Sequence, residues 1–189
     1  MALASVILIT GLAVFWSVSL RNVLKYRGTR VRNPSETPLS IGFILALTGS
    51  LLLFAESLAL IALERTGNIY IMIGVPQILG LSLFFIACFL HAWSVAVRGR
   101  YATSWSMRDN HKLVTEAPYN IVRHHSYLAY MLMILGVTLV WMKWFTLIPW
   151  IAIPGYILVS RSEEKLLIER FGDQYREYMK HVGAFIPRL

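Results

Sequence analysis

Three adjacent polar side chains, Arg123, His124 and His125, stand directly before an apolar segment that begins at Ser126. A guanidinium and imidazoles at this place can hold an anionic or nucleotide-like ligand through charge-assisted hydrogen bonds. The same side chains could instead anchor the end of a membrane helix by reaching into the polar interface. We call residues 123–125 the basic patch, and the rest of the chain must decide between a ligand site and an anchor.

A pair of neighbouring carboxylates, Glu163 and Glu164, lies further along the chain. Two short apolar segments, 126–142 and 144–160, separate these carboxylates from the basic patch. Two short helices joined by so tight a turn favour a hairpin, which returns the chain to the face that it left. We therefore expect the basic patch and the two glutamates to be neighbours in space, although they are far apart in sequence.

Glu163 also has a purely structural interpretation. Ser160 and Glu163 match the Ser-x-x-Glu capping box that begins many helices, and carboxylates in a first turn favour the helix dipole. Glu163 could therefore be only a cap, and the two roles are compatible. A zinc site built from the histidines and glutamates is conceivable, but the chain has no cysteine pair and no His-Glu-x-x-His motif, so we predict no metal.

The composition indicates an integral membrane protein. Of the 189 residues, 57% are hydrophobic and 15% are charged, whereas about 25% of the residues in a soluble domain are charged. The net charge of +8 does not indicate nucleic acid, because the basic residues lie in short segments between apolar runs, which favours an anionic membrane face. Cys88 is the single cysteine, so no internal disulfide is possible.

Three apolar segments are long enough to cross the roughly 30 Å hydrocarbon core of a bilayer as helices. They are residues 2–20, 39–63 and 69–97, and Pro76 predicts a kinked or interfacial start for the third. No basic residue precedes the first segment, so we expect it to be retained and not cleaved as a signal. With the hairpin, the sequence predicts an all-α polytopic membrane protein with about five transmembrane helices. Whether both hairpin segments cross fully stays open, and the charge pattern favours crossing.

The charge pattern predicts how the helices are oriented. The second predicted loop has only Glu64 and Arg65 and the fourth only Lys143, while basic residues fill the first and third loops. With five spans, both basic loops and the C-terminal segment lie on one side, which the positive-inside rule makes cytoplasmic. We therefore expect the N-terminus outside, and the site and the C-terminus on the cytoplasmic face. The basic residues are Arg21, Lys25, Arg27, Arg30, Arg32, Arg98, Arg100, Arg108, Lys112 and Arg123.

The chain divides into a three-span region, residues 1–97, and a C-terminal region, residues 98–189, which carries both polar clusters. The tail is too charged to span a membrane, but its apolar positions recur at helical spacing. We expect an amphipathic helix that ends near Gly183 and either lies along the cytoplasmic interface or packs on the third loop. Its apolar positions are Leu167, Phe171, Tyr175, Tyr178 and Val182.

The two polar clusters together form a longer pattern. The first reads H-K-L-V-T-E-A-P-Y-N-I-V-R-H-H-S-Y and the second R-S-E-E-K-L-L-I-E-R-F-G-D-Q-Y-R-E-Y. This two-part pattern, with an apolar hairpin between its halves, resembles that of the isoprenylcysteine carboxyl methyltransferase family and its relatives, including phospholipid methyltransferases. His125 stands where the family usually has proline, and Ala117 and Ala129 stand where glycine is common. The matching residues are His111, Leu113, Val114, Thr115, Tyr119, Arg123, His124, Ser126 and Tyr127, then Glu163, Glu164, Leu167, Phe171, Gly172, Tyr175 and Tyr178.

The resemblance implies an enzyme that moves a methyl group from S-adenosyl-L-methionine, leaving S-adenosyl-L-homocysteine, to a lipid-borne acceptor that enters from the bilayer. The acceptor that it implies first is a prenylcysteine-type carboxylate, which is already ionised at neutral pH and needs no general base. Catalysis would then be mostly positioning, with reacting atoms about 3–3.5 Å apart. This makes residues 98–189 the catalytic region.

The resemblance also implies roles for individual residues. Glu163 or Glu164 would pair with the α-ammonium of the cofactor, Arg123 or His124 would meet its carboxylate, and Arg161 would orient an anionic acceptor. Arg123, Glu163 and Arg161 are thus the expected catalytic residues. The expected cofactor-binding residues are His111, Lys112, Leu113, Val114, Tyr119, Arg123, His124, His125, Ser126, Tyr127, Glu163 and Glu164.

Other functions remain open at the level of sequence. The acceptor could be a phospholipid amine, or the chain could be an NADPH-dependent membrane reductase of the sterol type, whose C-terminal pattern is similar but whose chains are longer. A non-enzymatic membrane scaffold is a third possibility. Glu56 and His91 lie inside predicted spans and are functional candidates for that reason. Glu56 could instead be neutral and hydrogen-bonded to a neighbouring helix, an interpretation that we favour slightly, and His91 could simply reach the interface. The oligomeric state is not predicted.

Overall fold

The computed structural model describes residues 3–25, 40–99 and 112–188. Regular structure in these ranges is helical, apart from one isolated bridge between Val122 and Gly183. A 3-10 helix, Trp144–Ile151, leads directly into the fifth α-helix. The all-α class is therefore confirmed for this part of the chain. The α-helices are α1 (Leu3–Lys25), α2 (Ile41–Arg65), α3 (Val75–Arg98), α4 (His125–Trp141), α5 (Ala152–Phe171) and α6 (Asp173–His181).

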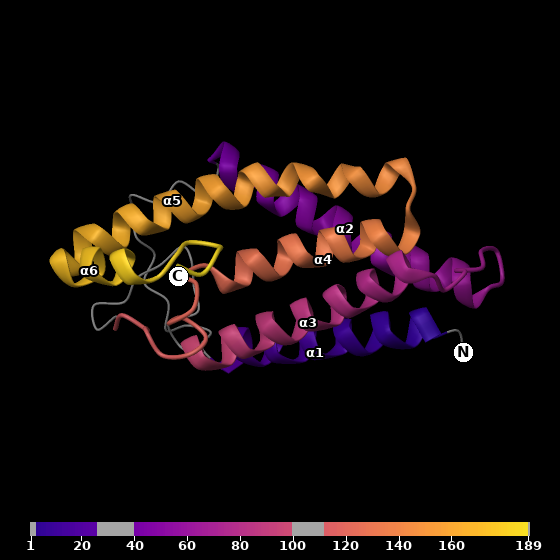
Figure 1. Cartoon of the computed structure of the whole chain (residues 1–189), viewed down its shortest axis with the longest axis horizontal. Helices are drawn as coiled ribbons and strands as arrows, with labels where there is room; N and C mark the ends of the chain where they lie inside the picture. The colour runs from indigo at the N-terminus through magenta and orange to yellow at the C-terminus, as the bar shows by residue number, and fades with distance from the viewer. Residues whose placement is uncertain (1–2, 26–39, 100–111, 189) are drawn as a thin grey trace.

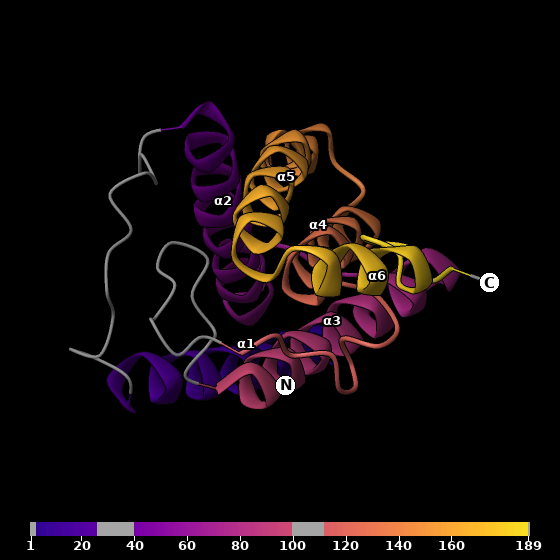
Figure 2. The same cartoon turned by 90° about the vertical axis from the view of Figure 1, so that its left-hand side faces the viewer.

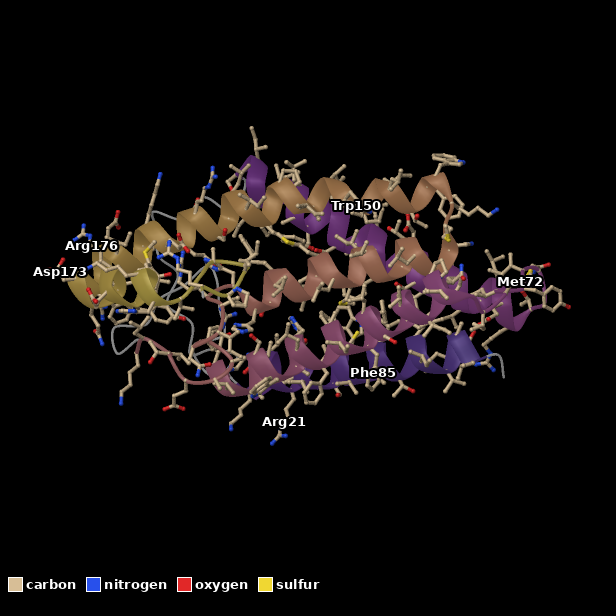
Figure 3. The ribbon with its side chains drawn as sticks, in the orientation of Figure 1. Arg21, Met72, Phe85, Trp150, Asp173 and Arg176 are labelled. Carbon is tan, nitrogen blue, oxygen red and sulfur yellow. The ribbon has the colours of Figure 1, made fainter. Side chains whose placement is uncertain are left out.

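Five helical segments have the composition of membrane spans. Among the described residues, α1, α2, α3 and the continuous segment formed by the 3-10 helix and α5 are long and apolar enough to cross a membrane. The 17-residue apolar α4 extends about 26 Å at 1.5 Å per residue, close to the hydrocarbon thickness. Phe85 and Trp150 lie between the ends of the bundle (Figure 3) and are 42% and 37% exposed. The chain is therefore a multi-pass membrane protein.

The membrane helices form two groups, which meet where α2 contacts α1 and α4. α3 packs on both α1 and α4, while α2 packs on α5. Figure 2 shows α1 with α3 on one side of the bundle and α2 with α5 on the other. The last turns of α3 and α5, the first turn of α4, and α6 gather at one end, whereas α1 begins at the opposite end (Figure 1). Both polar clusters therefore share one end of the bundle.

Glycine allows α2 and α5 to approach closely. A Cβ atom on Gly155 would lie 2.4 Å from the backbone nitrogen of Ala46 and 2.7 Å from the carbonyl oxygen of Gly42. Such small-residue contacts are typical of helix pairs in membranes, where van der Waals packing takes over from the hydrophobic effect. This contact fixes the position of α5, and with it Glu163 and Glu164, relative to α2.

Replacing Gly155 by valine should force α2 and α5 apart and lower the free energy of unfolding by about 1–3 kcal/mol, because the added side chain meets backbone that cannot move aside. Thermal or denaturant unfolding of the detergent-solubilised protein measures the effect. Ala59→Val, on an exposed position of α2, is the matched control and should change the stability little. Equal stability of the Gly155 variant and the wild type would show that the helices do not pack this closely.

Two spans differ from the predicted segments at their ends. α3 does not begin at residue 69, because Pro76 occupies its first turn, where a missing backbone N–H costs nothing. α5 does not end near residue 160 but continues to Phe171. Ser160 therefore lies inside α5, and its hydroxyl donates to a carbonyl oxygen of the preceding turn at 2.9 Å. The predicted capping box at Ser160 and Glu163 is wrong, and Glu163 projects from the interior of a continuous helix.

The C-terminal tail is not the continuous amphipathic helix that its spacing predicts. Gly172 adopts a φ of +53°, which favours glycine, and this residue ends α5. The short α6 then buries Tyr175, at 1% exposure, and leaves charged residues such as Asp173 and Arg176 exposed at the outer end of the molecule (Figure 3). The break brings α6 against the loop that precedes α4.

Candidate functional site

The basic patch is held in place by the C-terminal end of the chain. The backbone N–H of Arg123 donates to the carbonyl oxygen of Gly183 at 2.8 Å, and that of His124 donates to Ala184 at 3.0 Å. These two bonds run beside the isolated bridge at Val122. Of the two predicted places for the tail, the structure therefore shows packing on the third loop.

The side chain of Arg123 joins three parts of the chain. Its Nε and Nη2 donate to Oε1 of Glu164 on α5, at 3.0 and 2.8 Å. Its Nη1 donates to the carbonyl oxygens of Val182 and Met179 at the end of α6. Only 7% of this side chain is exposed. Arg123 thus has a structural role whether or not a ligand is bound.

His124 lies between the two carboxylates. Its Nε2 is 2.8 Å from Oε1 of Glu164, and its Nδ1 is 3.7 Å from Oε2 of Glu163. The imidazole is 5% exposed. The prediction that the hairpin makes the basic patch and the paired glutamates neighbours is therefore confirmed.

The two glutamates differ in their remaining capacity to accept hydrogen bonds. Glu164 is shared between Arg123 and His124, whereas Glu163 accepts a hydrogen bond from the Tyr127 hydroxyl at 2.6 Å and has only a long contact with the imidazole. A carboxylate has about four lone-pair sites. The exposed fractions, 13% for Glu163 and 16% for Glu164, do not separate the two, but the spare acceptor sites make Glu163 the better placed to bind a further cation.

Tyr119 and His125 pack beneath this cluster. The Tyr119 hydroxyl lies 2.9 Å from Oγ of Ser94 on α3, and the His125 ring meets the Tyr119 ring edge-on at 5.1 Å between centroids. Tyr178 of α6 donates its hydroxyl to the carbonyl oxygen of Tyr119. Burial raises the pKa of the Tyr178 phenol, so the group stays a neutral donor. These contacts tie the loop before α4 to α3 and α6.

Several residues of the predicted site make no hydrogen bond or ion pair with this cluster in the part of the chain that the structure describes. Lys112 is exposed, and Leu113 and Val114 are half-buried in an irregular segment. Arg161 is exposed on α5 and is not among the residues that line the cavity described next. His111 lies outside the described residues. The structure therefore gathers the expected cations and carboxylates, but it does not bring Arg161 to them.

A cavity of about 370 Å³ lies among α1, α2, α3, α4 and α5, directly beside the cluster. Tyr127 connects the two, because it lines the cavity while its hydroxyl contacts Glu163. On the α1 and α2 side, the lining residues Trp16, Leu47 and Leu51 are 43%, 46% and 61% exposed, so the cavity is accessible from the lipid-facing surface. Other lining residues are Phe15, Ser19, Asn22, Val23, Phe43, Ala46, Ser50, Phe54, His91, Val95, Arg98, Ser126, Tyr130, Tyr156 and Val159.

Arg98 and His91 are two basic residues that line this cavity together, and the sequence alone does not place them in one site. With Val95 they occupy one face of α3 at i, i+4 and i+7, a spacing that the sequence does show. His91 does not reach the interface as the sequence suggests: it is 7% exposed and its ring stacks on Phe15 at 4.1 Å. Which face of α3 turns inward depends on the helices around it.

The arrangement places groups for both charges next to a mostly apolar cavity. A zwitterionic polar ligand fits the cluster of Arg123, His124 and the glutamates, and a hydrocarbon chain fits the cavity. Within residues 3–25, 40–99 and 112–188, no group of three or more His, Cys, Asp or Glu side chains is placed to hold a metal ion.

Comparisons with known proteins find relatives that match part of the chain. Three curated relatives match, and the chain spans between about a third and three fifths of their lengths. Protein-S-isoprenylcysteine O-methyltransferase B of Arabidopsis thaliana is 28% identical over 57% of this chain and 57% of its own length. Protein-S-isoprenylcysteine O-methyltransferase of Dictyostelium discoideum is 32% identical over 43% of this chain and 35% of its own. Cobalt-zinc-cadmium resistance protein CzcN of Cupriavidus metallidurans is 36% identical over 51% of this chain and 46% of its own.

The family model for phospholipid methyltransferases matches residues 75–174, which is more than half of the 189 residues. These residues include α3, the basic patch, the hairpin and both glutamates. The same elements bring the charged cluster and the cavity together. On this match the chain belongs to the phospholipid methyltransferase family.

Proposed function

We propose that the chain is an integral membrane methyltransferase that uses S-adenosyl-L-methionine and methylates a lipid-borne, prenylcysteine-type carboxylate. One observation carries the proposal: the charged cluster at Glu163 shares Tyr127 with a lipid-accessible cavity. A polar methyl donor and an apolar acceptor can therefore meet at one residue. Family membership and the names of the two isoprenylcysteine relatives support the reaction type.

The residues present fit the proposed donor. Glu163 has acceptor capacity to spare for an α-ammonium group, while Arg123, whose Nη2 makes one hydrogen bond to Glu164, has a second N–H on that atom to offer an α-carboxylate beside His124. When bound, S-adenosylmethionine supplies an electrophilic methyl group on its sulfonium. Tyr127 orients Glu163, and the aromatic walls of the cavity exclude water from the acceptor. With an ionised carboxylate as acceptor no residue has to remove a proton, so the contribution of the chain is to bind and to position.

The proposed active site faces the cytosol. The exposed basic residues Arg21 and Lys25 lie in the last turns of α1, which ends toward the same end of the bundle as the charged cluster (Figure 1). The positive-inside rule assigns that end to the cytoplasm, with the start of α1 on the other side. A cytosolic donor would then reach the cluster directly, while the acceptor enters sideways from the bilayer.

Methyl transfer itself tests the proposal. The purified protein in lipid nanodiscs is given methyl-labelled S-adenosylmethionine with N-acetyl-S-farnesylcysteine or with phosphatidylethanolamine. Base-labile label in the farnesylcysteine product is the expected result. Label in the phospholipid alone would replace the proposed acceptor by a phospholipid amine, and transfer to neither would contradict the prenylcysteine assignment.

A further inference from the structure

We infer that Arg98 and Ser126 form a head-group subsite in the cavity, which holds the anionic oxygen of a single-chain lipid acceptor. This inference rests on the proposed methyltransferase function, whose acceptor it describes. It assigns the acceptor-orienting role to Arg98 on α3 in place of the exposed Arg161. Arg98 is then a specificity-determining residue that touches the substrate.

Arg98 reaches the cavity with part of its guanidinium unpaired. Its Nε atom is inaccessible to solvent and has no hydrogen-bond partner, and no ion pair within 4.0 Å joins it to a carboxylate in the described part of the chain. A guanidinium is always charged and only donates. A buried donor without a partner costs free energy, more so when it is charged. An oxyanion in the cavity would satisfy this donor.

Ser126 presents a second unpaired group to the same cavity. Its Oγ is buried and has no partner among the residues that the structure describes, and it comes from the first turn of α4, opposite the face of α3 that carries Arg98. A third buried atom without a partner there, Nδ1 of His91, belongs to a ring whose Nε2 lies 3.1 Å from Ser19 Oγ. Polar atoms that lack partners therefore line one cavity from two helices.

The position of this subsite suits the proposed reaction. Arg98 and Ser126 line the same cavity as Tyr127, whose hydroxyl donates to Glu163, so a head group bound there lies beside the proposed donor site. The rest of the lining is largely apolar, with Phe15, Phe43, Leu47, Leu51 and Phe54. At about 370 Å³ the cavity is near the lower end of the roughly 300–1,000 Å³ of ligand pockets, which favours one hydrocarbon chain over two.

A binding experiment on the protein in detergent tests the subsite with three single-chain probes. They are N-acetyl-S-farnesylcysteine, its carboxamide, and lysophosphatidic acid, which separates a carboxylate from a phosphate as the source of the oxyanion. Wild type should bind at least one anionic probe about 10- to 100-fold more tightly than the carboxamide, the range for one charge-assisted hydrogen-bonding group. Equal affinity for all three probes would overturn the inference.

The variant Arg98→Gln should lose this preference, because its affinity for the anionic probe falls while its affinity for the carboxamide stays unchanged. Ser126→Ala, an independent variant, should lower the affinity for the anionic probe by a few-fold. Arg21→Gln is the matched control, because Arg21 is exposed and points away from the bundle (Figure 3). Unchanged affinity for the anionic probe in both cavity variants would contradict the subsite.

Binding of S-adenosylhomocysteine, measured on the same samples, separates the two proposals. It should be the same in wild type and in Arg98→Gln, because Arg98 is assigned to the acceptor and not to the donor. If wild type prefers the anionic probe but does not bind S-adenosylhomocysteine, the methyltransferase proposal fails while the anionic subsite stands. If wild type binds S-adenosylhomocysteine but binds the anionic probes no more tightly than the carboxamide, only the subsite fails.

Discussion

Glu163→Gln should weaken the binding of S-adenosylhomocysteine by about 2–4 kcal/mol, on the order of 30- to 1,000-fold in Kd, because the variant removes a charge that pairs with the ligand ammonium in a mostly buried place. Glutamine keeps the size of the side chain and can still accept a hydrogen bond from Tyr127. The fold should therefore survive. Isothermal titration of the purified variant measures the effect.

Glu169→Gln is the matched control for this variant, because it removes the same charge from an exposed position of the same helix. Its affinity for S-adenosylhomocysteine should equal that of the wild type. An affinity of Glu163→Gln within about threefold of the wild type, where a lost buried charge pair predicts far more, would mean that Glu163 does not bind the donor.

Arg123→Ala should lower the free energy of unfolding by about 3–5 kcal/mol, the usual cost of removing one partner from a buried ion pair. The variant leaves Glu164 with His124 alone and removes the Arg123 hydrogen bond to the carbonyl oxygen of Val182. α6 and the C-terminal segment should then detach from the loop before α4. Denaturant unfolding in mixed micelles, with limited proteolysis of the tail, measures both effects.

The exposed ion pair between Arg176 and Asp173 provides the contrast. These side chains are 59% and 97% exposed, so Arg176→Ala should cost at most about 1 kcal/mol. Removing Arg123 and Glu164 together should cost less than the sum of the two single variants, because no charge is then left unpaired. Additive losses would show that the two side chains do not depend on each other.

The sequence predicts the meeting of the two polar clusters for a simple geometric reason. Two apolar segments that are each close to a membrane thickness, with a short turn between them, bring Arg123 and Glu164 to the same end of the bundle. That inference needs only the lengths of the two segments and one reversal of the chain direction. The contact of 2.8 Å between these side chains confirms it. The pattern of residues in both clusters then indicates the family, which the match over residues 75–174 shows.

The sequence does not predict features that depend on packing between helices. The spacing around Ser160 matches a cap, but no residue there stops α5, and the break comes at Gly172, where a positive φ is adopted. Likewise, Arg98 is one basic residue among many until α3 packs against α1 and α4 and turns that face toward the cavity. A cavity formed by side chains from five helices has no signature in any one segment.

Thermal unfolding of the detergent-solubilised protein with S-adenosylhomocysteine or NADPH tests the central claim, that the basic patch and the paired glutamates form one site for a sulfonium nucleotide. At a hundredfold excess over Kd, S-adenosylhomocysteine should stabilise the protein by about 2.7 kcal/mol. NADPH at the same concentration should have no effect. Stabilisation by NADPH alone, or by neither ligand at millimolar concentration, would contradict the claim.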